Sequence, residues 1–136
     1  MILNESFTLA NGVAIPKLGL GTWFISDENV SKAIKDAVAL GYRHIDTAQG
    51  YFNERGVGEG IRKCGVSRQE MFVTTKLGAD IKEYDKAVSS IDHSLKLLGL
   101  DYIDLMLIHS PKPWVEYHEE NRYPEGNRQA WSALED

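Results

Sequence analysis

Four polar residues in separate parts of the chain carry side chains whose combined chemistry is that of proton transfer: Asp46, Tyr51, Lys76 and His109. If these groups met in one cleft, they could protonate a carbonyl oxygen while another molecule delivered hydride. A lysine cation beside a phenol favours the phenolate, so Tyr51 near Lys76 would be a usable general acid–base. The imidazole of His109 could donate to the substrate oxygen and orient the carbonyl.

Three of these residues close short apolar runs, which span residues 42–46, 72–76 and 102–109. The runs recur about every thirty residues with a helical pattern between them, which is the spacing of βα units in a parallel sheet or barrel. Catalytic groups in such barrels lie at the C-terminal ends of several strands. We therefore expect the four side chains to converge on one cleft, with Lys76 close to both the carboxylate and the phenol.

Each of the four residues has a simpler explanation when it is taken alone. Asp46 could be a solvated strand end, Lys76 a surface amine and His109 a satisfied core histidine. Tyr51 could be an ordinary loop aromatic. Together these explanations fit less well, because ionisable groups that close three successive buried strands would crowd into a poorly solvated mouth. A buried lysine is costly without a partner, and Asp46 would supply its counter-ion.

The elements that must position these residues can be followed along the chain. Asn11-Gly12 between two alternating runs predicts a hairpin over residues 7–16 with a type I′ turn. Residues 18–22 are typical of a first barrel strand. Four parallel strands are thus expected, ending near Thr22, Asp46, Lys76 and His109.

Helices are expected between the strands, each ending at a glycine that can adopt a left-handed conformation. Ser26 is the expected N-cap of the first helix, and the third begins at about Glu83. Residues 110–127 are polar and aromatic, and we expect a long loop there before a last helix begins at Arg128. The whole of 1–136 is expected to be a single domain, in which the first three helices end at Gly41, Gly65 and Gly99.

Composition and charge exclude several function classes. The net charge of −5 provides no basic surface for nucleic acid or anionic lipid, so neither partner is expected. No segment approaches the roughly 18 apolar residues of a membrane span. The single cysteine, Cys64, excludes a disulfide framework; it indicates a structural thiol and a reducing, cytoplasmic compartment.

Other chemistries find no support in the residue pattern. No serine or cysteine occupies a nucleophile-elbow motif, and the four histidines lack zinc-binding spacing, so no metal is expected. Residues 56–60 contain three glycines, but no strand precedes them as a nucleotide-binding loop requires.

At these residues the chain resembles the aldo-keto reductases. The resemblance rests on five segments that together cover nearly the whole chain: 18–23 (LGLGTW), 41–48 (GYRHIDTA) with Tyr51 and Asn53-Glu54, 57–58 (VG), 72–77 (FVTTKL) and 101–109 (DYIDLMLIH) with Pro111. The long Asp-Thr-Ala…Tyr…Asn-Glu segment is highly specific to that family.

The resemblance implies a (β/α)8 barrel of the TIM type, with an N-terminal hairpin closing its bottom, and NADPH-dependent reduction of aldehydes and ketones. It makes Tyr51 the proton donor, tuned by Lys76 and Asp46, and gives His109 the task of orienting the carbonyl. The substrate would be a small-molecule carbonyl compound of a sugar-like, keto-acid or small-aldehyde type. Thr22 and Asp46 would lie near the nicotinamide ribose, and Trp23 would form a wall of the substrate pocket.

Two departures from the family pattern affect that pocket. Many members carry an aromatic residue shortly after the lysine and another directly after the histidine, where this chain has Leu77-Gly78 and Ser110. We expect a wider and more polar pocket lined by Trp23, Ser110 and Trp114, unless Trp114 folds back to fill it.

The third departure concerns length. A (β/α)8 barrel typically needs about 250 residues, so 136 residues correspond to its N-terminal half. Two functions remain open: a carbonyl reductase, or a non-catalytic half-barrel or assembly module that binds no cofactor productively. A half-barrel on its own would have open sheet edges, through which we expect it to self-associate.

Overall fold

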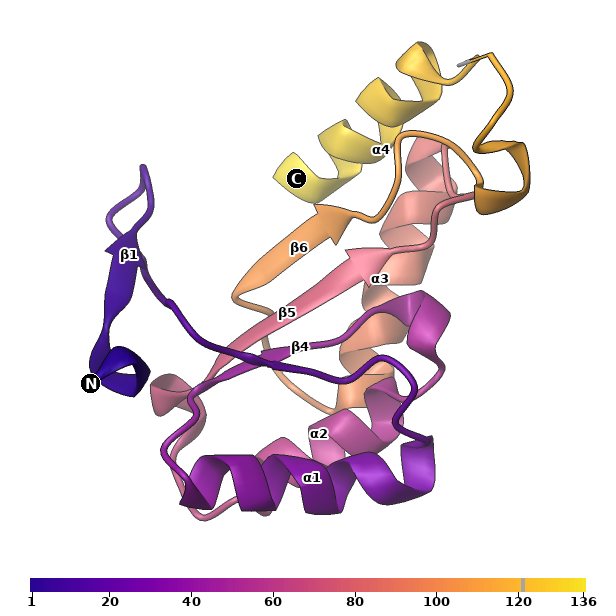
Figure 1. Ribbon diagram of the computed structural model, residues 1–136. Helices are drawn as coiled ribbons and strands as arrows, with labels where there is room; N and C mark the ends of the chain where they lie inside the picture. Colours follow the sequence, from indigo (N-terminus) through magenta and orange to yellow (C-terminus); the bar gives the residue numbers. More distant parts are fainter. Residues whose placement is uncertain (121) are drawn as a thin grey trace.

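The computed structural model describes residues 1–120 and 122–136; residue 121, within the predicted loop after His109, lies outside the described residues. A two-stranded hairpin precedes a four-stranded parallel sheet, and the helices lie on one face of that sheet (Figure 1). The strands are β1 (Ser6–Thr8), β2 (Ala14–Pro16), β3 (Leu20–Gly21), β4 (His44–Asp46), β5 (Phe72–Leu77) and β6 (Leu105–Ile108).

The order of the parallel sheet follows the chain, β3-β4-β5-β6, so every crossover joins neighbouring strands. Gly21 of β3 pairs with Asp46 of β4, and Lys76 of β5 pairs with Leu107 of the adjacent β6. This register brings the C-terminal ends of all four strands to one edge of the sheet, whereas the hairpin lies beyond the opposite ends (Figure 1). The residues that follow the strands therefore share one rim.

Helical segments occupy the connections between the strands. They are α1 (Asp27–Ala39), α2 (Glu54–Arg62), α3 (Tyr84–Leu98) and α4 (Pro124–Glu135), with 3-10 turns at Ile2–Asn4, Gln49–Tyr51, Arg68–Glu70 and Trp114–Glu116. Ser26 is the N-cap of α1, but its hydroxyl accepts from the Asn29 side chain at 2.9 Å rather than from the backbone. Left-handed glycines follow α1 and α3, at Gly41 and Gly99.

Apolar side chains fill two clusters between the helices and the sheet. The larger joins α1 and α2 to the sheet, and the smaller joins α3 and α4 to the end of β5 around Leu77. Gly58 lets α2 approach the end of α3, because a Cβ there would lie 1.8 Å from the Leu98 carbonyl oxygen. The glycines of residues 56–60 therefore serve helix packing. The larger cluster contains Val30, Ile34, Val38, Ile45, Val57, Ile61, Met71, Val73 and Leu98.

Some local predictions were wrong. The hairpin turn is not type I′: Gly12 has a φ of +84°, but Asn11 is absent from the positive-φ residues, and its side chain instead accepts from the Val13 amide. The last helix begins at Pro124 rather than at Arg128. Proline was interpreted as a loop residue there, although it is favoured in the first turn of a helix, where no intrahelical N–H bond is lost.

Candidate active site

Lys76, near the end of β5, is the centre of the rim of strand ends. Its amine donates to the Asp46 carboxylate at 2.6 Å, to the Thr47 carbonyl at 2.8 Å and to the Tyr51 hydroxyl at 3.2 Å. The lysine side chain is only 12% exposed and that of Asp46 is 33% exposed, so the ion pair lies at the boundary between core and solvent. One ammonium group thus links a carboxylate and a phenol that come from different elements.

Tyr51 is held by the short 3-10 turn that follows β4. The side chain of Gln49 in the same turn accepts from the Gly78 amide at 2.8 Å and from the Ser90 hydroxyl at 2.9 Å. Its amide group donates to the Ser94 hydroxyl at 2.9 Å. These bonds tie the turn to α3 and to the end of β5. This role of Gln49 was not predictable from the sequence, because its partners are remote in the chain.

Asn53 fastens the loops after β3 and β4 to each other. It is fully buried; its Nδ2 donates to the Thr22 and Ile25 carbonyls at 2.9 Å each, and its Oδ1 accepts from the Thr47 hydroxyl at 2.7 Å. The preceding residue, Phe52, has a left-handed backbone with a φ of 56° and an exposed ring. A left-handed non-glycine residue is sparsely populated and is kept there by its surroundings.

Thr22 is fully buried beside the backbone of Asp46. Its backbone amide and its hydroxyl both donate to the Asp46 carbonyl, at 3.0 Å and 3.1 Å. The hydroxyl that was expected near a cofactor ribose is therefore engaged in positioning Asp46, while the Asp46 carboxylate is open to solvent.

His109 follows β6 and faces the tyrosine. The Tyr51 and His109 rings are 5.7 Å apart and nearly perpendicular, and the Trp114 ring lies edge-on at 5.3 Å from the imidazole. Burial, together with the positive charge of Lys76, lowers the pKa of His109 below 6.5, against a smaller opposing effect of Asp46. The imidazole is therefore neutral at physiological pH, with one ring nitrogen a donor and the other an acceptor.

A cavity of about 630 Å³ opens above these groups and has mainly aromatic walls. Trp114 packs edge-on against His109 and lines the cavity, as in the second of the two outcomes left open for the pocket. Ser110 does not line it: the side chain is buried, and its backbone carbonyl accepts from Lys82. The lining residues are Trp23, Gly50, Tyr51, Phe52, His109 and Trp114.

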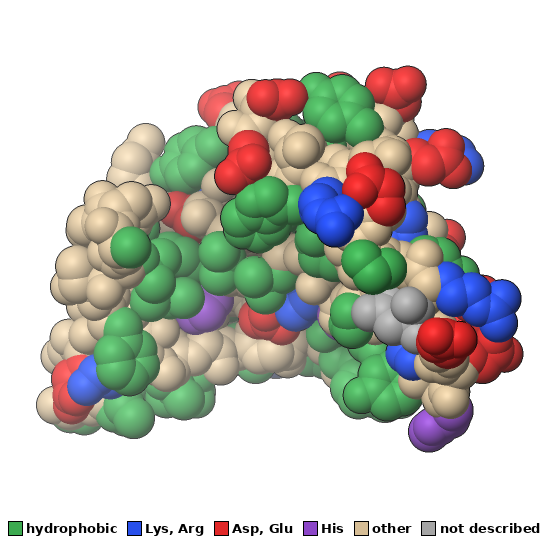
Figure 2. Space-filling model, turned by 90° about the horizontal axis from the view of Figure 1, so that it is seen from above, with side chains coloured by type: hydrophobic (Ala, Val, Ile, Leu, Met, Phe, Trp, Pro, Cys, Tyr) green, Lys and Arg blue, Asp and Glu red, His purple; other side chains and the backbone are tan. Residues whose placement is uncertain are grey.

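The surroundings of the cavity are rich in exposed aromatic groups. Trp23 stacks on Phe24 at 4.4 Å, and both rings are mostly exposed. Figure 2 shows hydrophobic side chains exposed across the middle of one face of the molecule.

Within residues 1–120 and 122–136, no group of three His, Cys, Asp or Glu side chains could hold a metal ion. The helices in these ranges are all too short or too polar to cross a membrane.

Comparison with known proteins identifies the family. The model of the aldo/keto reductase family matches residues 17–136, and the chain belongs to this family. Morphine 6-dehydrogenase of Pseudomonas putida is 54% identical over 107 residues, which are 78% of this chain and 36% of that protein. Methylglyoxal reductase DkgA of Escherichia coli is 46% identical over 112 residues, which are 82% of this chain and 40% of that protein.

Solved structures agree with the fold. An aldo/keto reductase from Brucella melitensis superposes with a TM-score of 0.88 at 39% identity, covering 98% of this chain and 48% of that one. An aldo-keto reductase of Bombyx mori in complex with NADP gives a TM-score of 0.79 at 39% identity, covering 96% and 47%. The chain thus spans less than half the length of these relatives. The predicted family and half-barrel fold are confirmed.

Proposed function

We propose that a protein carrying this chain reduces aldehydes or ketones to alcohols with NADPH, and that Tyr51 donates the proton. The observation that carries the proposal is the single lysine amine bonded to both Asp46 and the Tyr51 hydroxyl. This arrangement opens onto an aromatic cavity that also contains a neutral imidazole.

Each side chain has a separate task in this proposal. The Tyr51 hydroxyl gives its proton to the carbonyl oxygen, and the Lys76 ammonium stabilises the phenolate that remains. The Asp46 carboxylate accepts from the Lys76 ammonium and holds it in place. His109, neutral because of burial, donates a second hydrogen bond to the carbonyl oxygen and thereby orients the carbonyl carbon.

NADPH, when bound, supplies the hydride that adds to the carbonyl carbon. The exposed part of the Asp46 carboxylate is suited to a ribose hydroxyl, which is a hydrogen-bond donor. Thr22 assists by holding the Asp46 backbone. Because Thr22 is buried, this support of Asp46 is its main role, and direct contact with the cofactor is secondary. The relatives support this cofactor, since one solved structure contains NADP.

The cavity walls indicate the substrate class. Trp23, Phe52 and Trp114 offer flat apolar surfaces, which suit a small carbonyl compound with an apolar or aromatic substituent. The names of the relatives range from a methylglyoxal reductase to a morphine 6-dehydrogenase, so substrates in the family differ widely in size. The alternative, a non-catalytic assembly module, has less support because nothing in such a role needs Lys76 to link an acid and a phenol.

Tyr51→Phe is the direct test, in a protein that carries this chain together with the remaining length found in its relatives. We expect the reduction rate to fall about 10² to 10⁴-fold, the usual contribution of a general acid, with NADPH affinity nearly unchanged. Tyr42→Phe, at the opposite end of the sheet, is the matched control. Rates within a few-fold of wild type would show that Tyr51 is not the acid. If adding NADPH to the wild type produced no change in fluorescence, the assembly module would be favoured instead.

A further inference from the structure

Lys82, in the connection between β5 and α3, is a buried amine without an ion-pair partner among the residues that the structure describes. It is 8% exposed, and its ammonium group donates to the Ser110 carbonyl and to the Asn127 side-chain oxygen, both at 2.8 Å. Burial lowers the pKa of Lys82, which reflects the cost of holding this charge away from water. The Lys82 ammonium is thus held at an energetic cost, and both of its hydrogen bonds go to neutral oxygens.

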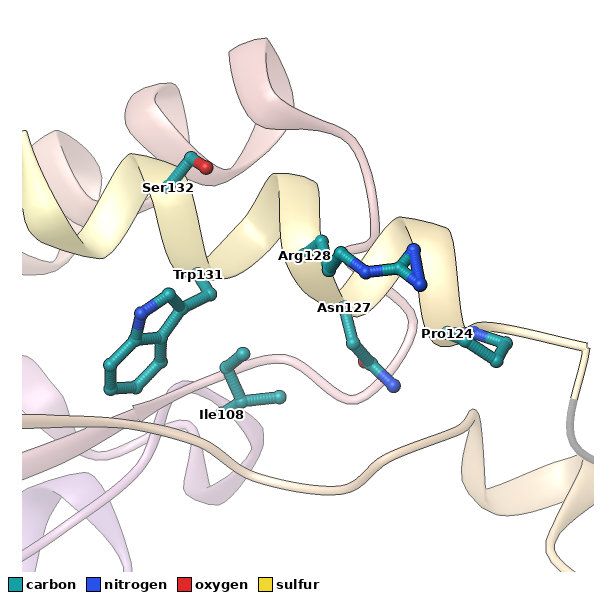
Figure 3. Close-up of a pocket in the computed structure, with 6 residues that line it drawn as sticks. All are labelled: Ile108, Pro124, Asn127, Arg128, Trp131 and Ser132. Carbon is teal, nitrogen blue, oxygen red and sulfur yellow. The ribbon is translucent and has the colours of Figure 1, made fainter.

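Asn127 completes the arrangement from the first turns of α4. Its Nδ2 donates to the Pro111 carbonyl at 2.7 Å, while its Oδ1 accepts from Lys82. Figure 3 shows Asn127 extending from α4 on the same side as Ile108, at the end of β6. The preceding Gly126 allows this approach, because a Cβ there would lie 2.7 Å from the Cβ of Lys82. We call Lys82 and Asn127 the clamp.

The clamp holds two consecutive carbonyl groups, those of Ser110 and Pro111, directly after His109. The same segment carries Trp114, whose ring covers the His109 imidazole at 5.3 Å. The path of the chain out of β6 is thereby fixed at the first two of the four residues that separate His109 from Trp114. The backbone amide of His109 is itself tied to the Leu77 carbonyl at 3.3 Å.

We infer that Lys82 and Asn127 are positioning residues: they hold Trp114 against His109, so that the Trp114 ring forms a wall of the substrate cavity. The kinetic part of this inference rests on the proposed carbonyl reduction, whereas the structural part does not. Neither residue lines the cavity, so the clamp acts through Trp114 and not by contact with substrate.

The first test measures position alone. In the wild type, a nuclear Overhauser effect is expected between the Trp114 indole and the His109 imidazole protons, assigned with Trp114→Phe. Lys82→Met, which keeps the length of the side chain but donates no hydrogen bond, should abolish it. Lys86→Met is the matched control, because Lys86 is exposed and forms a surface ion pair with Glu83, three residues away on the same helix end. An unchanged Overhauser effect in Lys82→Met would overturn the inference, whether or not the protein is a reductase.

The second test is a double-mutant cycle on the active protein, with 4-nitrobenzaldehyde as a probe that reaches Trp114 and propanal as one that does not. We expect Lys82→Met and Trp114→Ala each to lower kcat/KM for the aromatic aldehyde roughly tenfold, and propanal reduction by less than about threefold. Because both act on one wall, the double variant should fall no more than about twofold below Trp114→Ala.

A merely structural role for Lys82 predicts a different pattern. The losses would then multiply in the double variant, and both aldehydes would be affected alike. Asn127→Ala provides an independent route if Lys82→Met folds poorly, since it removes the Pro111 bond and one of the two Lys82 bonds while leaving the amine attached to Ser110. It should repeat the selective loss for the aromatic probe, and equal losses for both probes would contradict the inference. A wild type without any carbonyl reduction would refute the proposed function, while the Overhauser measurement would still decide the clamp.

Discussion

Asn53 offers a sharp test of how the site is supported, because one fully buried amide joins the loops after β3 and β4 through three hydrogen bonds. Asn53→Ala would remove the side-chain donor from the Thr22 and Ile25 carbonyls and the acceptor from the Thr47 hydroxyl. The Thr22 carbonyl would keep its bond from the Ile25 amide. Three hydrogen bonds at about 1 to 1.5 kcal/mol each give a loss of about 4 kcal/mol in the free energy of unfolding. That is a large share of the roughly 5 to 15 kcal/mol that stabilises an ordinary domain.

Asn53→Asp is the more discriminating variant. It keeps the oxygen that accepts from Thr47, but it directs a second oxygen at two carbonyl oxygens where the amide now donates. A buried carboxyl in that place should have a raised pKa, because only its protonated form can donate. The folded state would then hold a proton that the unfolded chain has released, so stability should fall as pH rises above the ordinary carboxyl pKa of about 4.

Urea unfolding followed by circular dichroism measures both effects. With an m value of about 2 kcal/mol/M, Asn53→Ala should lower the midpoint by about 2 M. Asn29→Ala is the control: the Asn29 side chain is exposed and donates to the Ser26 hydroxyl near the helix surface, so its replacement should change stability by less than about 0.5 kcal/mol. If Asn53→Asp were as stable as the wild type at every pH, the amide would not face the two carbonyls and the reasoning would fail.

Three further perturbations test other parts of the structure. Burial raises the pKa of Glu54 above 4.5, so the stability of the wild type should fall as pH rises from 4.5 through that raised pKa. Glu54→Gln should remove this fall, and its urea midpoint should therefore depend less on pH. Gly58→Ala should prevent soluble folding, because its Cβ would lie 1.8 Å from the Leu98 oxygen, whereas Gly50→Ala, with open space around it, should express normally. A protein of these 136 residues alone would expose the edges of β3 and β6, and it should self-associate in sedimentation equilibrium; a compact monomer of 15.3 kDa would contradict this.

The strand ends were predictable from the sequence because a parallel register needs little information. Asp46, Lys76 and His109 each follow an apolar run, and parallel strands of similar length must present their ends at one rim. The distances of 2.6 Å and 3.2 Å from Lys76 to Asp46 and Tyr51 are possible because a long lysine side chain starts near the end of the strand next to β4. Tyr51 closes no strand and lies in a turn after β4. It was singled out for its phenol chemistry beside Lys76, and the family resemblance then gave it the role of proton donor.

The supporting residues were not predictable in the same way. Gln49 and Lys82 look like ordinary polar residues of connecting segments, and only the packed structure shows their partners, 41 and 45 residues away in the Ser90 and Asn127 side chains. The start of α4 at Pro124 was missed for a related reason, since a proline marks either a loop or a first helical turn until its neighbours are known.

The position of Trp114 shows how the two kinds of residue depend on each other. The sequence left two outcomes for the pocket, and local composition could not choose between them. The decision lies with the chain that follows His109: Ser110 is turned inward, its carbonyl bonded to Lys82, and the next carbonyl bonded to Asn127. With Ser110 buried, the chain brings Trp114 back over the imidazole and supplies an aromatic wall from four residues further on. The wall of the cavity is thus set by a lysine and an asparagine that do not line it.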